Sequence, residues 1–300
     1  MVDRASTFSD PQIIELLQEK YVPVAIDQWY QRKQRDAEGD FYRKVAGQGP
    51  RNDFNDTTQG FYVATAEGQL LGFNNNRGSE RVLGLLERSL NEFRPGGQGL
   101  AALKALTATD PRYARQPPEG GLVVRVMSKV LGGYDEPDRE REEIFQSAIG
   151  RDNLWIRGDE HQALVEGRVP DSLATRIARF HLIDNTRGEP PMWAVKDIRR
   201  LELTLNEGRL RGSLLLETSD GRRGYEAELL GFVESEGDKV TRFDVVAKGQ
   251  FWGEGRYTRG APKGKFPLAI AFKLADGQDL ADGVPPQGTK GWLASYLDPR

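Results

Sequence analysis

The chain has 300 residues, of which 38% are hydrophobic and 29% are charged, and its formal net charge is −3. This composition is typical of a globular protein, and the length is sufficient for two domains with a sizeable core. Acidic and basic side chains are balanced both in the first 95 residues and in the remainder, so we expect no nucleic-acid partner. No apolar run is long enough for a membrane span.

The absence of cysteine excludes disulfides, thiolate metal sites and thiol catalysis. Residues 1–10 lack the apolar core of a signal peptide, although an exported protein whose signal peptide had been removed would look the same. The sequence therefore predicts a soluble protein that is either cytoplasmic or exported. No motif indicates a cofactor.

The first predicted elements are a helix and a strand. Ser9 or Asp10 is a candidate N-cap, and Pro11 after them begins a run of apolar residues at helical spacing. The β-branched residues of Val22–Ile26 then predict a strand. Residues 31–46 are mostly charged and contain Gly39, which predicts either two short helices or one kinked helix.

A hairpin and a second amphipathic helix complete the first 95 residues. Residues 61–65 and 69–73 read as two strands joined by a turn at Ala66-Glu67-Gly68. The helix begins near Ser79, has apolar residues at helical spacing as far as Phe93, and ends at Pro95-Gly96-Gly97.

Helix, strand, helix, hairpin and helix follow one another over residues 5–95 in an order that resembles a thioredoxin-like domain. That fold places WCxxC where the strand enters the helix, and the corresponding residues here are Trp29, Tyr30, Gln31 and Arg32. The resemblance therefore implies a redox-dead member of the fold, and thiol–disulfide oxidoreductase activity is excluded. The chain departs from the family at the cis-proline before the hairpin, which is replaced by Gln59-Gly60.

The resemblance implies that Asp27, Trp29, Tyr30 and Gln59 gather at one end of the sheet. They would form an aromatic and polar surface for a peptide or a partner domain. In the alternative interpretation, Trp29 and Tyr30 pack against the second domain of the chain itself.

The second part of the chain begins after a linker predicted at residues 96–121, so that the predicted domains are 1–95 and 122–300. Leu122–Leu131 reads as a strand, a charged helix is expected to end near Ile149, and two further helices follow. The second of them carries an apolar stripe formed by Leu173, Ile177 and Phe180.

Alternating strands of eight to ten residues, separated by glycine turns, follow from residue 199 to about residue 275. This spacing predicts an antiparallel meander that is strongly twisted or closed as a barrel. The predicted fold class is therefore α+β, with a thioredoxin-like α/β domain, a helical segment and a barrel-like sheet. No family is recognised for this second part.

The densest run of functional side chains is 179–193, which joins the helices to the sheet. His181 is one of two histidines, and Asp184 or Glu189 could orient it as a general base. Arg187 and Trp193 of the same run are candidate ligand-binding residues. The alternative is a structured connector in which Asp184 makes turn hydrogen bonds and Arg187 pairs with a carboxylate.

Two weaker candidates remain. Asp159-Glu160-His161 suggests a metal site, but neighbouring residues on a helix do not share a face, so we expect no metal. Strand alternation places Trp252, Glu254 and Arg256 on one face, where they could line a ligand cavity or form an exposed cross-strand pair.

The sequence thus predicts a non-redox binding or interaction protein, because no complete catalytic set is visible. Its partner is an unidentified small molecule, peptide or protein. The competing hypothesis is a hydrolase or lyase that uses His181 with Asp184 or Glu189 at the mouth of the second sheet.

Overall fold

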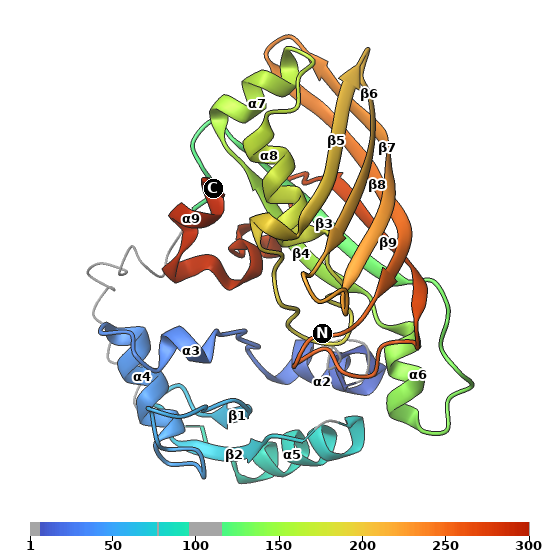
Figure 1. Ribbon diagram of the computed structural model, residues 1–300. Helices are drawn as coiled ribbons and strands as arrows, with labels where there is room; N and C mark the ends of the chain where they lie inside the picture. Colours follow the sequence, from blue (N-terminus) through green and yellow to red (C-terminus); the bar gives the residue numbers. More distant parts are fainter. Residues whose placement is uncertain (1–6, 77, 96–115, 300) are drawn as a thin grey trace. The chain divides into compact units, whose positions relative to one another are not determined.

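A computed structural model describes residues 7–76, 78–95 and 116–299 of the chain (Figure 1), and these residues form two units. One unit lies within residues 3–115 and the other within residues 116–300, so the division falls inside the linker predicted at 96–121. Residues 96–115 of that linker lie outside the described residues. Each unit has a hydrophobic core of its own.

The second unit is built on an open seven-stranded antiparallel sheet with the strand order β4-β3-β9-β8-β7-β6-β5. Its strands are β3 (Leu122–Val130), β4 (Gly150–Ile156), β5 (Ile198–Asn206), β6 (Arg209–Glu217), β7 (Gly224–Glu236), β8 (Lys239–Trp252) and β9 (Lys265–Leu274). Within the described part of the chain β4 and β5 remain the two edges, so the predicted closure into a barrel is wrong.

The predicted meander is otherwise confirmed, because every strand from β5 to β8 pairs with the next along the chain. The turn between β5 and β6 contains Glu207 and Gly208, whose φ angles of 48° and 74° are the left-handed values that a two-residue hairpin turn requires. The longest strand of the meander is β8, which ends at Trp252.

Helices cover one face of this sheet, which we call the inner face. These are α7 (Gly158–Val165), α8 (Asp171–Arg176) and the π-helical turn η2 (Ile177–His181), and α7 and α8 lie against the sheet in Figure 1. The predicted stripe is confirmed, since Leu173, Ile177 and Phe180 are at most 4% exposed. Leu173 and Ile177 pack with the inward side chains of the strands, so the space under the sheet is filled by protein.

The C-terminal segment (279–297) covers the opposite, outer face of the sheet beside β3 and β4. It contains η4 (Leu280–Gly283), η5 (Pro286–Gly291) and α9 (Leu293–Leu297). Asn153 of β4 donates to the carbonyl oxygens of Ala281 at 2.7 Å and Val284 at 3.0 Å. As a result Trp155 on β4 is fully buried together with Tyr296. The remaining short elements of this unit are α6 (Glu140–Ser147) and η3 (Val195–Asp197).

The first unit consists of η1 (Thr7–Ser9), α2 (Pro11–Lys20), α3 (Gln28–Gln31), α4 (Ala37–Ala46), the hairpin of β1 (Phe61–Ala64) and β2 (Leu70–Asn74), and α5 (Ser79–Glu92). Asp10 caps α2 through a 2.9 Å bond from the Gln12 N–H, as predicted. The core joins Ile13 of α2, Val63 of β1 and Leu85 of α5.

The strand predicted at Val22–Ile26 is wrong, because this stretch has no regular secondary structure. The sheet of the first unit therefore has two strands, and nothing in it identifies a thioredoxin-like fold. High β-propensity alone does not make a strand without a neighbouring strand to pair with. The interruption predicted at Gly39 is wrong, because α3 ends at Gln31 and α4, capped by Asp36, is one continuous helix that contains Gly39.

Candidate functional site

His181 lies at the end of η2 with its side chain fully buried. Its Nε2 atom is 2.7 Å from the hydroxyl oxygen of Tyr296, and its Nδ1 atom is 3.1 Å from Oδ2 of Asp152 on β4. The Nδ1–Oδ2 contact is too bent to be a directed hydrogen bond, although the distance is short. The same Tyr296 hydroxyl accepts the backbone N–H of Trp155 at 3.3 Å.

The Tyr296 oxygen accepts from the Trp155 N–H and keeps a proton of its own, so its 2.7 Å contact with Nε2 of His181 is a hydrogen bond whose direction follows from the tautomer of the ring. Burial raises the pKa of the Tyr296 hydroxyl well above its ordinary value, so the phenol remains neutral. Carboxylate, imidazole and hydroxyl are neighbours here, as in a catalytic triad, but Asp152 makes no directed hydrogen bond to the ring and no part of the ring faces solvent.

Neither predicted partner of His181 contacts it. Asp184 is bonded to other groups, and Glu189 is exposed. Oδ1 of Asp184 accepts the Thr186 N–H at 3.1 Å, and its Oδ2 accepts Nη2 of Arg187 at 2.5 Å. Glu189 lies on the surface. The carboxylate that the structure places at His181 is Asp152, which the sequence analysis missed because β4 was not predicted.

Arg187 is a buried cation that holds two loops together. Its Nε donates to the carbonyl of Thr258 at 3.1 Å, and its Nη1 donates to the Tyr134 hydroxyl at 2.9 Å. With Asp184 paired to the same guanidinium, the buried charge is compensated. This is the arrangement expected of a structured connector.

Trp193 is completely buried in the same connector. Its Nε1 donates to the carbonyl of Leu182 at 2.9 Å, and the guanidinium of Arg223 lies 3.9 Å from its ring centroid. Burial lowers the pKa of Arg223 to about 10. The geometry leaves Trp193 no face on which a ligand can stack.

Trp252, Glu254 and Arg256 do not share a strand face, because β8 ends at Trp252 and the other two lie in the following loop. The predicted alternation at these positions is therefore wrong. Oε2 of Glu254 accepts two backbone N–H groups of that loop, and Trp252 donates to the carbonyl of Gly221 at 3.0 Å. Glu254 and Arg256 are exposed at the surface.

In the first unit, α3 lies against the segment that precedes β1. The side-chain oxygen of Gln28 accepts both the N–H and the hydroxyl of Thr58, at 3.1 and 3.0 Å. Trp29 follows Gln28 on α3, and Gln59 follows Thr58 in the segment before β1. Asp27 caps α3 through the Trp29 N–H at 3.0 Å.

The side chains presented by this region are apolar and exposed. Trp29 is 56% exposed, and the charged groups of Arg32 and Lys33 lie 4.6 and 4.5 Å from its ring centroid. Tyr30 is partly exposed, and Gln59 is exposed. Immediately before α3, Val22 is 88% exposed, Val24 75% and Ile26 45%. Val22, Val24 and Ile26 thus form an exposed apolar stretch at alternate positions of the chain.

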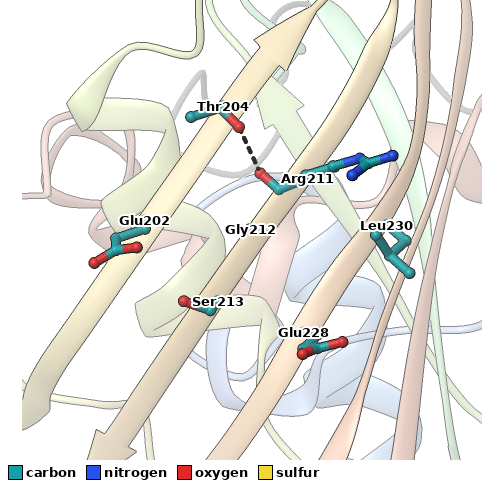
Figure 2. A pocket seen from close by; sticks show the side chains of 7 residues that line it. All are labelled: Glu202, Thr204, Arg211, Gly212, Ser213, Glu228 and Leu230. Atoms are coloured by element: carbon teal, nitrogen blue, oxygen red, sulfur yellow. Dashed lines mark hydrogen bonds between the residues drawn. The ribbon is translucent and has the colours of Figure 1, made fainter.

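A second exposed area lies on the outer face of the sheet, across β5, β6 and β7 (Figure 2). It is a shallow hollow of about 320 Å³ lined by Glu202, Thr204, Arg211, Gly212, Ser213, Glu228 and Leu230. Glu202, Ser213 and Glu228 are directly paired neighbours on the three strands. None of Glu202, Arg211 and Glu228 has an ion pair within 4.0 Å among the described residues, so their charges remain available to a partner.

Residues 7–76, 78–95 and 116–299 contain no cluster of histidine and carboxylate side chains that could hold a metal ion. His161, which the sequence offered as a possible metal ligand, makes two other contacts. Its Nδ1 contacts the carbonyl of Gly120, and its Nε2 accepts the Val240 N–H. In the part of the chain that the structure describes, no helix has the length and apolar character needed to cross a membrane.

Comparison with known proteins identifies no relative of this chain. No family model matches the sequence, no curated protein is similar to it, and no solved structure resembles its fold. The functional argument therefore rests on the geometry of the chain itself.

Proposed function

We propose that this chain is a non-catalytic interaction protein, and that it binds a partner protein through the exposed segment Val22–Ile26 together with Trp29. The observation that supports this proposal is the exposure of four large apolar side chains in one short stretch. Leaving an aliphatic side chain in water forgoes about 1.5–3 kcal/mol relative to burying it. A partner that covers this stretch would gain that free energy.

The backbone of the exposed segment is suited to strand addition. The flanking residues Tyr21 and Asp27 have extended φ and ψ angles, and no backbone hydrogen bond is made by residues 22–26 within the described chain. In an extended strand, alternate residues direct their N–H and C=O groups to the same edge. Pro23 has no N–H, so the edge of residues 22, 24 and 26 carries more donors and is the one that an added strand would use.

A matched pair of proline substitutions tests this geometry. Val24→Pro removes a donor from the proposed edge, whereas Ala25→Pro removes one from the opposite edge. A photo-crosslinking amino acid at position 24 of the full chain, in its native cell extract, first identifies the bound protein by mass spectrometry. Binding of that purified protein is then measured for both variants.

We expect Val24→Pro to weaken binding at least about tenfold and Ala25→Pro to leave it within about twofold. Amide exchange of the wild-type chain should slow at residues 24 and 26 when the partner is added, but not at residue 25. Equal effects of the two prolines would contradict strand addition. The absence of any specific adduct at position 24 would contradict the interaction role itself.

The competing hypothesis, a hydrolase or lyase centred on His181, receives no support from the geometry. The imidazole is enclosed by Tyr296 and Asp152, and neither Asp184 nor Glu189 is its partner. A general base must reach the proton that it removes from a substrate.

A further inference from the structure

The outer face of the sheet carries a continuous row of apolar side chains across its central strands. Leu230, Val246, Ala271 and Met127 are directly paired from β7 to β8, β9 and β3, so they point to the same side. Leu230 is 57% exposed, Val246 43% and Met127 37%. Outward positions of a sheet with one solvated face are normally polar, so this row, which we call the apolar row, indicates an interaction surface.

The charges around the apolar row are sorted by strand. On β7 the outward charged side chains beside the row are all acidic: Glu226, Glu228 and Glu234. On β8 two of the three outward charged side chains are basic: Arg242, Asp244 and Lys248. Glu228 is paired in register with Lys248, and Glu234 with Arg242. The seam between β7 and β8 therefore separates an acidic strand from a largely basic one.

This arrangement is complementary to itself. A two-fold axis parallel to the strands and midway between β7 and β8 would place β7 of one copy over β8 of a second copy. Leu230 would then contact Val246 of the second copy, and Glu228 would face its Lys248, with each contact occurring twice. Arg209 on β6 would face the like-charged Lys273 on β9 of the second copy. This contact lies one strand further from the axis, where the twist of two stacked sheets moves the two side chains apart.

We propose that the outer face of the sheet binds a second copy of this chain, through Leu230 and Val246 at the centre and the Glu228–Lys248 contacts beside them. An apolar centre enclosed by charged pairs is the usual anatomy of a specific interface. The hollow of Figure 2, with Glu202, Arg211 and Glu228 at its rim, would lie at the border of this contact. The surface is distinct from Val22–Ile26, so this proposal and the proposed function can fail separately.

The test is the mass of the full chain in solution, measured by sedimentation velocity from about 1 to about 200 µM, which spans the affinity of weak to moderate dimers. We expect a reversible monomer–dimer equilibrium. Leu230→Glu should weaken it at least about tenfold, because it places a charge at the centre of the apolar contact. Circular dichroism should be unchanged, since Leu230 is more than half exposed.

Charge exchange distinguishes self-association from binding of another protein. Glu228→Lys alone and Lys248→Glu alone each create like-charged contacts across the two-fold axis and should weaken the dimer, whereas the double exchange should restore it. The matched controls are the single exchanges Glu236→Lys and Lys239→Glu, at a cross-strand pair on the same two strands at their hairpin end, each of which should leave the dimer unchanged.

A monomer over the whole concentration range would overturn the proposal. So would a dimer that Leu230→Glu does not weaken, or one that the double exchange at 228 and 248 does not restore. In the first case a heterologous partner for this face would be indicated instead.

Discussion

His181 illustrates how far a single residue can be interpreted from its neighbours in sequence. A histidine close to Asp184 and Glu189 suggested a general base, but the side chain is turned inward and its contacts are with Asp152 and Tyr296, from remote parts of the chain. The structure assigns it to the attachment of the C-terminal segment. Its contribution should therefore be to stability.

Substitution of His181 or Tyr296 should destabilise the protein through the same contact. His181→Ala leaves the Tyr296 hydroxyl without this hydrogen-bond partner and opens a cavity, so we expect a loss of about 2–4 kcal/mol in the free energy of unfolding. Tyr296→Phe should cost about 1–3 kcal/mol, because it also leaves the Trp155 N–H unsatisfied. Urea unfolding of both single variants and the double variant measures the coupling.

The double variant should lose less than the sum of the two single losses, since both remove one shared hydrogen bond. Strictly additive losses would show that the two side chains act independently.

Residue-level prediction succeeded where the chemistry is local. Asp10 was identified as a helix cap and Asp184 as a turn acceptor, because each bonds to a backbone N–H two residues away. It failed where the partner is distant. Nothing near His181 in the sequence points to Asp152, and the burial of Trp193 under Arg223 depends on a strand that lies further along the chain.

At the level of elements, alternation identified the strands that have one solvated face. β5 to β9 mostly alternate between inward and outward residues, and this alternation predicted the meander, although not the single long strand β8. β4 was missed because it is covered on both faces at its end, where Leu154, Trp155 and Ile156 are all buried. Val22–Ile26 shows the opposite error, since a suitable composition there meets no neighbouring strand.

The C-terminal segment should loosen in acid. Arg125 pairs with Asp276 and Asp282, and Arg151 pairs with Asp279. The pKa of Asp276 is held below its usual range by the Gln278 N–H and then by Arg125, and the pKa of Asp279 by the Ala281 N–H and then by Arg151. A carboxyl whose pKa is lower in the folded than in the unfolded state stabilises the folded state. This stabilisation is complete above about pH 4 and is lost as the pH falls through the pKa of the folded state.

We therefore expect the urea midpoint of the second unit to decrease as the pH is lowered from about 5 to about 2. Arg125→Gln should make this decrease smaller, because it removes one of the charges that stabilise the ionised carboxyls. The effect should weaken at high salt, since Asp276 and Asp279 are exposed. A pH dependence identical in wild type and Arg125→Gln would contradict the role given to these pairs.

At the level of the whole molecule, the main cores of the two units share no residue. One joins α2, β1 and α5, and the other lies between the large sheet and its helices. The division near residue 115 was predicted approximately from composition, because a stretch rich in proline and glycine separates two regions of different periodicity. The openness of the sheet was not predictable, since strand spacing alone does not determine whether edges meet.

A core substitution in the first unit should act within that unit. Leu85→Ala removes a side chain that is 6% exposed and should destabilise this unit by about 2–4 kcal/mol. Hydrogen exchange resolved by peptide should show faster exchange in β1, β2 and α5 and unchanged rates in β7 and β8. Accelerated exchange throughout the large sheet would indicate that the two cores unfold together.

The covering of β4 by the C-terminal segment has a consequence for the order in which the chain can fold during synthesis. Asn153 and Ala281 are 128 residues apart in sequence, and Trp155 and Tyr296 are 141 apart. A nascent chain that has released β3 and β4 but not residues 279–297 therefore exposes Trp155. Burial of this side chain has to wait until residues 279–297 have been synthesised and have docked on β4.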